Sequence, residues 1–244
     1  MTVFFVSDLH LKPERPDLTR AFSRLINTTF QNASELFLLG DIFEAWIGDD
    51  TPTPTLEPVF EALKQLSDKG CKIYFQHGNR DFLVGEQFAQ SIDAILLPEE
   101  LTVELPVGKA VISHGDQLCT DDTEYMQFRT MVRNPHWQAE FLGKPLQERL
   151  AIAKQLRDAS KERTAEKSEY ITDVNPDAVA GLFKTSGVSL MIHGHTHRPC
   201  IHQNEIENKP VTRIVLGDWD TLGWYLKVDE HGYDLINFPI ESYA

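Results

Sequence analysis

Five short polar motifs, each placed directly after an apolar run of strand length, constrain the fold of this chain more than any other feature. The apolar runs alternate with two stretches, Leu18–Phe30 and Leu56–Leu66, whose apolar residues recur at helical spacing. This alternation predicts βαβ units and a mainly parallel sheet. The predicted strands are Val3–Ser7, Leu36–Gly40, Lys72–Gln76, Ala110–Ser113, Leu190–His193, Val211–Leu216, Trp224–Val228 and Tyr233–Phe238.

The motifs bring carboxylate, amide and imidazole groups to the predicted strand ends, where ligands gather in open α/β sheets. Asp8 and His10 lie two residues apart, so on an extended chain they face the same side and can hold one ion together. Successive motifs up to His114 are separated by about one βαβ unit, and the last gap is longer by about one helical hairpin. The motifs are Asp8-Leu9-His10, Gly40-Asp41, Gly78-Asn79-Arg80-Asp81, His114-Gly115-Asp116 and His193-Gly194-His195-Thr196-His197.

Each motif alone has an ordinary structural explanation. A Gly-Asp pair fits a turn, Gly-Asn-Arg-Asp fits a left-handed turn with a capping carboxylate, and a single histidine such as His114 is commonly a hydrogen-bonded core residue. The three histidines of the last motif are typical of metal binding, and the five motifs together favour a metal centre over a purely structural explanation. The other histidines are assigned no function: His77, His136, His202 and His231.

The ligand types indicate which metals would bind. Asp and Asn oxygens are mixed with imidazole nitrogens, and no thiolate belongs to the motifs, which suits Mn²⁺ or Fe, with Zn²⁺ or Co²⁺ as alternatives in vitro. A shared carboxylate would hold two ions about 3.5–4 Å apart and lower the pKa of a bridging water toward neutrality. The sequence therefore predicts phosphoester or phosphoanhydride hydrolysis by a metal-activated water.

The overall charge argues against one class of partner. The chain has 23 basic and 37 acidic residues, a formal net charge of −14, whereas nucleic-acid coat proteins bind phosphates through clustered Lys and Arg. Bound cations can still supply positive charge for a phosphate substrate. Three scattered cysteines, no apolar run of membrane-spanning length and no secretory signal before Asp8 lead us to expect an intracellular protein.

The segment from Asp121 to Lys167 contains no strand-like run. Asn134-Pro135 predicts a helix start, Trp137 and Phe141 share a helical face, and so do Leu146, Leu150 and Ala153. Between Tyr125 and Ala165, eight basic residues stand against four acidic ones. Such a segment suits an anionic ligand or a membrane surface, and the alternative is a helical hairpin with a solvated charged face. We expect a core of residues 1–120 and 171–244 and a helical cap of 121–170.

The ordered pattern D-x-H, GD, GN, H and GHxH resembles the calcineurin-like metallophosphoesterase superfamily from Asp8 to His197. The resemblance implies a four-layer α/β/β/α sandwich with the helical insertion as a cap over the metal cleft. It also implies seven metal ligands with Asp41 as the bridge, and it leaves His193 outside the GHxH pattern. One ion would be held by Asp8, His10, Asp41 and His197, and the other by Asp41, Asn79, His114 and His195.

The residue that follows Asn79 indicates which leaving groups the site can support. Protein phosphatases and DNA-repair nucleases of the superfamily have a histidine there, whereas this chain has Arg80. A guanidinium neutralises a phosphoryl oxygen but donates no proton at working pH. A serine alkoxide is a poor leaving group and needs a proton donor, which this site lacks. A phosphate leaves as a stable anion without one, so the site favours a pyrophosphate substrate.

Longer strings resemble one family of the superfamily, the UDP-2,3-diacylglucosamine diphosphatases of lipid A biosynthesis, nearly end to end. The resemblance implies a hydrolase with two Mn²⁺ ions that cleaves UDP-2,3-diacylglucosamine to 2,3-diacylglucosamine 1-phosphate (lipid X) and UMP, by attack of an activated water on the α-phosphorus. It also implies a peripheral protein on the cytoplasmic face of the inner membrane. The strings are LLGDIFEAWIGDD, FQHGNRDFLVG, HGDQLCTDD, SKERTAEKS followed by DVN, and IHGHTHRP.

By position, this resemblance implies catalytic roles for Asp41, Asn79, Arg80 and His195. Helical spacing places Arg157 on one polar stripe with three residues of the cap. Thr164 stands where the family pattern has Asn, and Gly143-Lys144 interrupts a stretch that is more apolar in the family. The implied substrate contacts are Asn79, Arg80, Asp122, Arg157, Ser160, Thr164, Lys167 and His195.

Two rival functions follow from the same fold. One is a hydrolase of the superfamily that acts on a soluble nucleotide, a cyclic nucleotide or a phosphoprotein. The other is a binding scaffold without catalysis, against which the complete set of converging ligands argues.

Overall fold

The computed structural model describes residues 1–165 and 173–243, and in the helix that ends at residue 165 it describes side chains up to residue 157. The strands are β1 Val3–Val6, β2 Glu35–Leu39, β3 Lys72–Gln76, β4 Ala94–Leu96, β5 Glu100–Leu105, β6 Gly108–Ser113, β7 Leu190–His193, β8 Cys200–Ile206, β9 Lys209–Val215, β10 Leu222–Asp229 and β11 Gly232–Pro239. The helices are α1 Pro16–Thr28, α2 Glu57–Asp68, α3 Glu86–Ser91, α4 Thr123–Val132, α5 Pro135–Leu142, α6 Leu146–Ala165 and α7 Pro176–Ser186, with 3-10 turns at Asp116–Leu118 and Ile240–Ser242.

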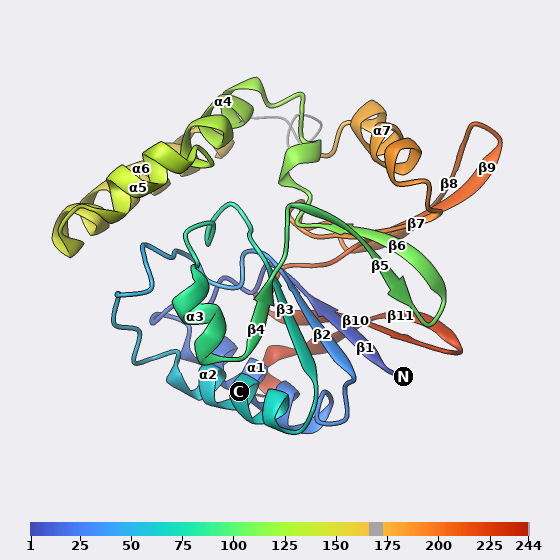
Figure 1. Cartoon of the computed structure of the whole chain (residues 1–244), viewed down its shortest axis with the longest axis horizontal. Coiled ribbons are helices and arrows are strands. Elements are labelled where there is room, and N and C mark those ends of the chain that lie inside the picture. Colours follow the sequence, from blue (N-terminus) through green and yellow to red (C-terminus); the bar gives the residue numbers. More distant parts are fainter. Residues whose placement is uncertain (166–172, 244) are drawn as a thin grey trace.

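The described strands form two mixed sheets (Figure 1). The six-stranded sheet has the order β11-β10-β1-β2-β3-β4, and the five-stranded sheet has the order β5-β6-β7-β9-β8. Neighbours from β1 to β4 are parallel, as are β6, β7 and β9, but β10, β11, β5 and β8 run antiparallel at the edges. The prediction of a mainly parallel sheet is therefore right for the centres and wrong for the edges, where strands are joined by short hairpins.

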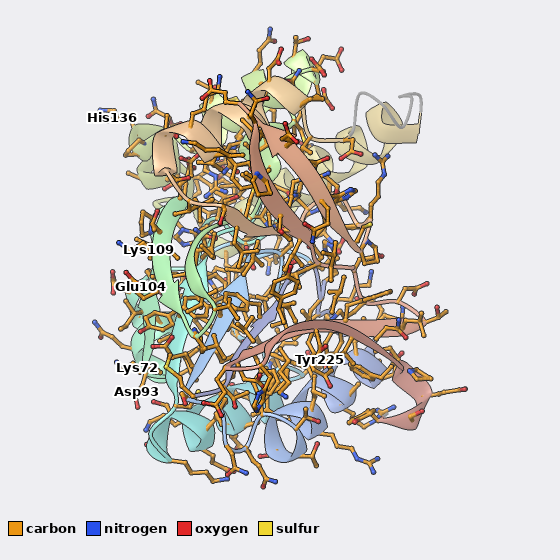
Figure 2. All side chains as sticks on the ribbon, turned by 90° about the vertical axis from the view of Figure 1, so that its right-hand side faces the viewer. Lys72, Asp93, Glu104, Lys109, His136 and Tyr225 are labelled. Carbon is orange, nitrogen blue, oxygen red and sulfur yellow. The ribbon has the colours of Figure 1, made fainter. Side chains whose placement is uncertain are left out.

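Three buried clusters separate four layers, which confirms the predicted α/β/β/α sandwich. Side chains of one face of the six-stranded sheet, such as Phe4 and Leu36, pack with α1 and α2. Their neighbours Phe5 and Phe37 point the other way, into the cluster between the two sheets, as the two-residue period of a strand requires. The third cluster lies between the five-stranded sheet and α7 and includes Met191 of β7 and Phe183 of α7. Figure 2 shows the same layers from the side, with Glu104 and Lys109 on the outer edge.

Helices α4, α5 and α6 follow β6 and project over one end of the sandwich (Figure 1). As predicted, α5 begins at Pro135, and the Asn134 side chain accepts the backbone N–H groups of His136 and Trp137. The Asn175-Pro176 pair starts α7 in the same way, a signal that the sequence analysis did not use. The predicted boundaries of the cap, residues 121–170, remain a prediction.

The predicted apolar stripe of α6 is correct for Leu146 and Ala153, which pack on the first cluster, and wrong for Leu150, which is 45% exposed. The inward face is centred on Arg149, whose side chain is buried and donates to the Ile47 carbonyl at 2.7 Å. Because neighbouring residues of a helix point about 100° apart, burying Arg149 turns Leu150 outward.

Candidate metal centre

The five motifs follow β1, β2, β3, β6 and β7, as predicted, and their loops meet at one end of the two sheets. One βαβ unit was expected between Asn79 and His114, but that interval holds α3, β4, β5 and β6 and carries the chain from one sheet to the other. The last interval contains α4 to α6, as expected. These loops therefore bring ligands from both sheets together.

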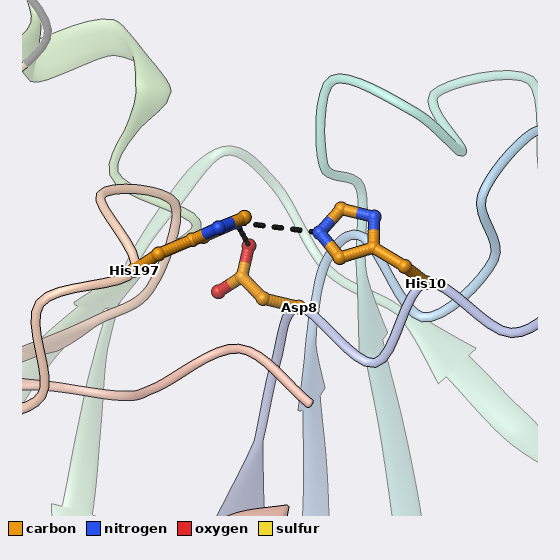
Figure 3. Close-up of side chains that lie close together, drawn as sticks. All are labelled: Asp8, His10 and His197. Carbon is orange, nitrogen blue, oxygen red and sulfur yellow. Dashed lines mark hydrogen bonds and ion pairs between the residues drawn. The ribbon is translucent and has the colours of Figure 1, made fainter. Parts of the chain in front are cut away.

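The first candidate metal position is formed by Asp8, His10 and His197, whose ligand atoms all lie within 4.8 Å of one another (Figure 3). His197 Nε2 lies 3.4 Å from Asp8 Oδ1 and 3.3 Å from His10 Nε2. The other carboxylate oxygen of Asp8 accepts from the Ser7 hydroxyl and, at 2.9 Å, from the His195 backbone N–H. Asp8 Oδ1 is buried and its contact with His197 Nε2 is long, so this oxygen is available to a cation that displaces the His197 proton.

The second candidate position is formed by Asp8, Asp41 and His114, again within 4.8 Å. The Nδ1 atom of His114 is 2.8 Å from the Leu39 carbonyl, which leaves Nε2 facing Asp41 at 3.7 Å. Asn79 Oδ1 lies 3.1 Å from His114 Nε2 and 2.8 Å from His195 Nδ1. The residue common to both positions is Asp8, and the bridging role of Asp41 remains a prediction.

Two motif glycines are required by close approach. A Cβ on Gly78 would lie 2.1 Å from Asp41 Oδ1, and one on Gly194 would lie 2.0 Å from Ser7 Oγ and 2.3 Å from Asp8 Oδ2. Larger residues would displace the carboxylates of both candidate positions.

Backbone strain is concentrated at the same residues. Asp8 and His10 were predicted to lie on an extended chain. This prediction is wrong, because both residues have positive φ, at 57° and 49°. Strain of this kind costs about 1–3 kcal/mol per residue and gathers at functional sites. Of the eight described non-glycine residues with positive φ, five belong to the motifs, namely Asp8, His10, Asp41, His195 and His197.

Asp81, the last residue of the Gly-Asn-Arg-Asp motif, connects two metal loops. Its buried carboxylate accepts the backbone N–H groups of Gly78 at 2.8 Å and Ile42 at 2.8 Å, with that of Asp41 at 3.2 Å. The turn expected from this motif is therefore closed by Asp81 and is also tied to the loop after β2. This arrangement fixes the separation of Asp41 and Asn79.

The histidines differ in their protonation. Burial, together with the neighbouring His114, lowers the pKa of His195 to about 3, so its ring is neutral. Burial alone would lower the pKa of His197, but its contact with the Asp8 carboxylate raises that pKa to about 9. The metal-free centre therefore holds a proton on His197 that a bound cation must displace.

The donor set suits two divalent cations. It consists of carboxylate and amide oxygens and imidazole nitrogens, and Asp8 belongs to both candidate groups. Cys119 is buried away from both groups in the cluster beneath α7. Mn²⁺ or Fe fits such donors, and the identity of the metal remains a prediction.

A cleft leads from this centre to the helical insertion. Asn79, Arg80 and Glu44 line its polar end, together with Arg157 of α6. The Nε atom of Arg80 is buried without a partner among the described residues. We call the other end the apolar cleft, and its side chains come from both the core and the insertion: Trp46, Ile47, Phe82, Trp137, Phe141 and Leu156.

Glu44 was missed by the sequence analysis. Its carboxylate lies 3.4 Å from His10 Nδ1 and 3.5 Å from Arg157 Nη1. Burial would raise the pKa of Glu44, but His10 and Arg80 lower it to about 2. The acidic residue three positions after Asp41 was a visible signal that the motif analysis did not use.

The remaining residues predicted to contact the substrate are Asp122, Ser160, Thr164 and Lys167. Asp122 caps α4 by accepting the Tyr125 backbone N–H at 3.0 Å. Ser160 and Thr164 belong to the part of α6 whose side chains are not described, and Lys167 lies outside the described residues.

The histidines without an assigned function lie outside both candidate positions. His77 Nε2 is 2.7 Å from the Val84 carbonyl, and His136 is exposed on α5 (Figure 2). His193 is buried, with Nδ1 2.9 Å from the Gly194 carbonyl and Nε2 3.0 Å from Arg213. Both ring nitrogens of His193 therefore contact groups that do not belong to the candidate metal positions.

Comparison with known proteins matches the family described as calcineurin-like phosphoesterase over residues 1–199. A UDP-2,3-diacylglucosamine hydrolase of Tolumonas auensis is 47% identical over 243 residues, covering 99% of this chain and 99% of that protein. The protein of the same name from Pseudomonas entomophila is 48% identical and covers 97% of this chain and 98% of its own length. The one from Stenotrophomonas maltophilia is 47% identical, with coverages of 96% and 98%.

Proposed function

Because this chain belongs to the calcineurin-like phosphoesterase family and shares 47% identity over 99% of its length with a UDP-2,3-diacylglucosamine hydrolase, we propose that it hydrolyses UDP-2,3-diacylglucosamine. The products are UMP and 2,3-diacylglucosamine 1-phosphate, an intermediate of lipid A biosynthesis. The observation that carries the proposal is the continuity of the metal centre with the apolar cleft, because a diphosphate with acyl chains needs both surfaces side by side.

We propose as metal ligands the seven residues named from the sequence, and the two candidate positions support this proposal. Asp8, His10 and His197 offer ligands to one ion, and Asp8, Asp41 and His114 to the other, with Asn79 and His195 beside the second. Two Mn²⁺ ions bound here would supply an activated water and neutralise phosphoryl charge. Asp41 would serve as the bridge.

Arg80 and Arg157 neutralise the diphosphate from the cleft side. The backbone N–H of Arg80 donates to Asp41 Oδ1 at 2.7 Å, which fixes the start of its side chain beside the second position. Its guanidinium carries no transferable proton, so the leaving group must depart as a stable anion. A sugar phosphate meets that condition, and the water oxygen then remains on the uridylate.

The apolar cleft accommodates acyl chains. Trp137 and Phe141 stack with ring centroids 5.1 Å apart, and Trp137 also faces Phe82 of the core at 6.2 Å. Chains lying between the insertion and the core would be covered from water on both sides. Asp122, Ser160, Thr164 and Lys167 remain proposed contacts to the head group.

A membrane contact is proposed for the insertion, with the protein peripheral on the cytoplasmic face of the inner membrane. None of the described helices combines the length and the apolar composition that crossing a bilayer requires. Met131, Leu142 and Leu150 of the insertion are 43%, 41% and 45% exposed. Arg129 and Arg149 pair with core carboxylates, and we propose that the exposed apolar side chains contribute to the membrane contact. Binding to zwitterionic vesicles should weaken with Leu142→Asp and not with Ile95→Asp.

The test is incubation of the purified protein with UDP-2,3-diacylglucosamine and Mn²⁺, followed by separation of nucleotides and lipids. UMP and the lipid monophosphate should appear in equal amounts and vanish when a chelator removes the metal. Equal turnover of a UDP-sugar without acyl chains would instead favour a hydrolase of soluble nucleotides. Absence of any metal-dependent hydrolysis would favour a scaffold.

A further inference from the structure

One face of α4 contacts three of the five motif loops. Tyr125, Arg129 and Arg133 are spaced four residues apart, so their side chains leave the helix on one side. This face meets Asp116 after β6, the Gly78 carbonyl after β3 and the His195 ring after β7. Neither the motif analysis nor the proposed catalytic residues give any role to Asp116, Arg129 or Arg133.

Asp116 anchors this face. Its carboxylate is 1% exposed and accepts the Tyr125 hydroxyl at 2.6 Å and Arg129 Nε at 2.8 Å. Arg129 also pairs with Glu99 at 2.8 Å. Burial and the negative charge of Asp116 raise the pKa of Tyr125 well above its ordinary value, so the hydroxyl stays protonated and donates.

Arg133 reaches the loop that carries Asn79. Its Nη2 donates to the Gly78 carbonyl at 3.0 Å, and the His77 carbonyl is 3.4 Å away. The guanidinium lies over the Phe82 ring at 5.7 Å, which holds it in place. Because Gly78 is bonded to Asn79, a shift of Arg133 would move the oxygen that contacts His114 and His195.

Tyr125 contacts the candidate ligand His195 on the loop after β7. Its ring lies 5.8 Å from the His195 ring at an interplanar angle of 30°. His195 is thus held between its contact with Asn79 and the aromatic face of α4. The helix that begins the insertion therefore contacts one candidate ligand, His195, directly and contacts the residue bonded to another, Asn79.

A second attachment of the insertion provides a comparison. On α6, Arg149 donates to the Ile47 carbonyl at 2.7 Å and pairs with Asp50, but residues 47–50 contain no motif residue. Both attachments use a shielded guanidinium and a core carbonyl, so both hold the insertion to the core. Of these two attachments, the one through α4 reaches the loops of the candidate ligands and the one through Arg149 does not.

We propose that Arg133 and Arg129, anchored on Asp116, are positioning residues that fix Asn79 and His195 for metal binding and turnover. The proposal adds a role for the insertion to the proposed function, and its expected effects on turnover rest on that function. It means that the insertion orders the metal centre as well as covering the substrate. Groups that orient ligands in this way are commonly worth about 10–100-fold in metal affinity or activity.

The test compares Arg133→Met with Arg149→Met in the full chain. Titration of metal-stripped protein with Mn²⁺ should show binding about tenfold weaker for Arg133→Met and unchanged for Arg149→Met. With UDP-2,3-diacylglucosamine, Arg133→Met should lower kcat about tenfold, whereas Arg149→Met should raise KM and leave kcat unchanged. Arg133→Lys retains a donor and should restore Mn²⁺ affinity to within about threefold of wild type.

Wild-type Mn²⁺ affinity and kcat in Arg133→Met would overturn the proposal, as would equal losses in Arg149→Met. Asp116→Asn and Arg129→Met should repeat the Arg133→Met result, provided that circular dichroism shows them folded. If either of these two variants does not fold, the Arg133→Met result decides, because Arg133 lies at the end of α4. The titration needs no substrate, so weaker Mn²⁺ binding in Arg133→Met supports the positioning role even if the wild type releases no UMP.

Discussion

Asp81→Asn tests whether one buried carboxylate both stabilises the fold and sets the metal centre. One oxygen accepts from Ile42, with Phe43 at 3.4 Å, and the other accepts from Gly78 and Asp41. An amide keeps one acceptor and turns an NH₂ group toward the donors that the other oxygen served. At least one buried backbone N–H at 2.8 Å, and a weaker second one, then lose their acceptor.

Each buried donor left unpaired costs about 1–3 kcal/mol, so the two together cost about 2–6 kcal/mol. An opposing effect exists, because burial and the charge of Asp41 raise the pKa of Asp81, and the amide removes that repulsion. We expect the lost acceptors to dominate, with a net loss of about 3 kcal/mol against a typical total of about 5–15 kcal/mol. With a slope near 3 kcal/mol/M, the urea midpoint falls by about 1 M.

The assay is urea unfolding of metal-stripped protein, followed by Mn²⁺ titration of the folded variant. Asp49→Asn is the matched control, because its carboxylate accepts the backbone N–H groups of Gly85 and Phe88, both at 2.9 Å, and contacts no motif residue. Both variants should be less stable, and only Asp81→Asn should bind Mn²⁺ more weakly. An unchanged midpoint in Asp81→Asn, or equal Mn²⁺ affinity in the two variants, would refute the reasoning.

Three further predictions concern the metals and the cleft. His197, with its pKa raised to about 9, is protonated in the metal-free chain below that pH, so Mn²⁺ affinity measured by titration should fall about tenfold per pH unit from pH 8 to 6; an affinity independent of pH would contradict this. Asp41→Ala should keep the fold by circular dichroism but retain less than about a tenth of wild-type kcat at saturating Mn²⁺, and greater retention would remove Asp41 from the bridging role. Arg157→Ala should raise KM for the acylated substrate about tenfold with metal content unchanged, as expected for one lost charge-assisted contact; an unchanged KM would mean that α6 does not contact the head group.

The sequence allowed the centres of both sheets and the meeting of the motifs to be predicted, because apolar runs and strand ends follow from burial alone. The edge strand β11 was predicted, but the edge strands β4, β5 and β8 were not. In β5 exposed residues alternate with half-buried ones, and β8 is mostly exposed, so neither has the apolar run that signalled the central strands. Their pairing depends on β6 and β9 being present beside them.

The candidate ligands were predictable as residue types at strand ends, but their geometry was not. Left-handed φ at Asp8, His10 and Asp41 is imposed by the hydrogen bonds of neighbouring loops, which a local pattern does not contain. The roles of Glu44 and Asp116 likewise depend on where α4 and α6 pack. A basic residue such as Arg149 looked like part of a surface and is a buried contact instead.

Hydrolysis in heavy-oxygen water tests the central claim most directly. The protein is incubated with UDP-2,3-diacylglucosamine and Mn²⁺ in labelled water, and the masses of both products are measured by mass spectrometry. Attack on the α-phosphorus predicts one labelled oxygen in UMP and none in 2,3-diacylglucosamine 1-phosphate. Label in the lipid phosphate, or no UMP at all, would contradict the account.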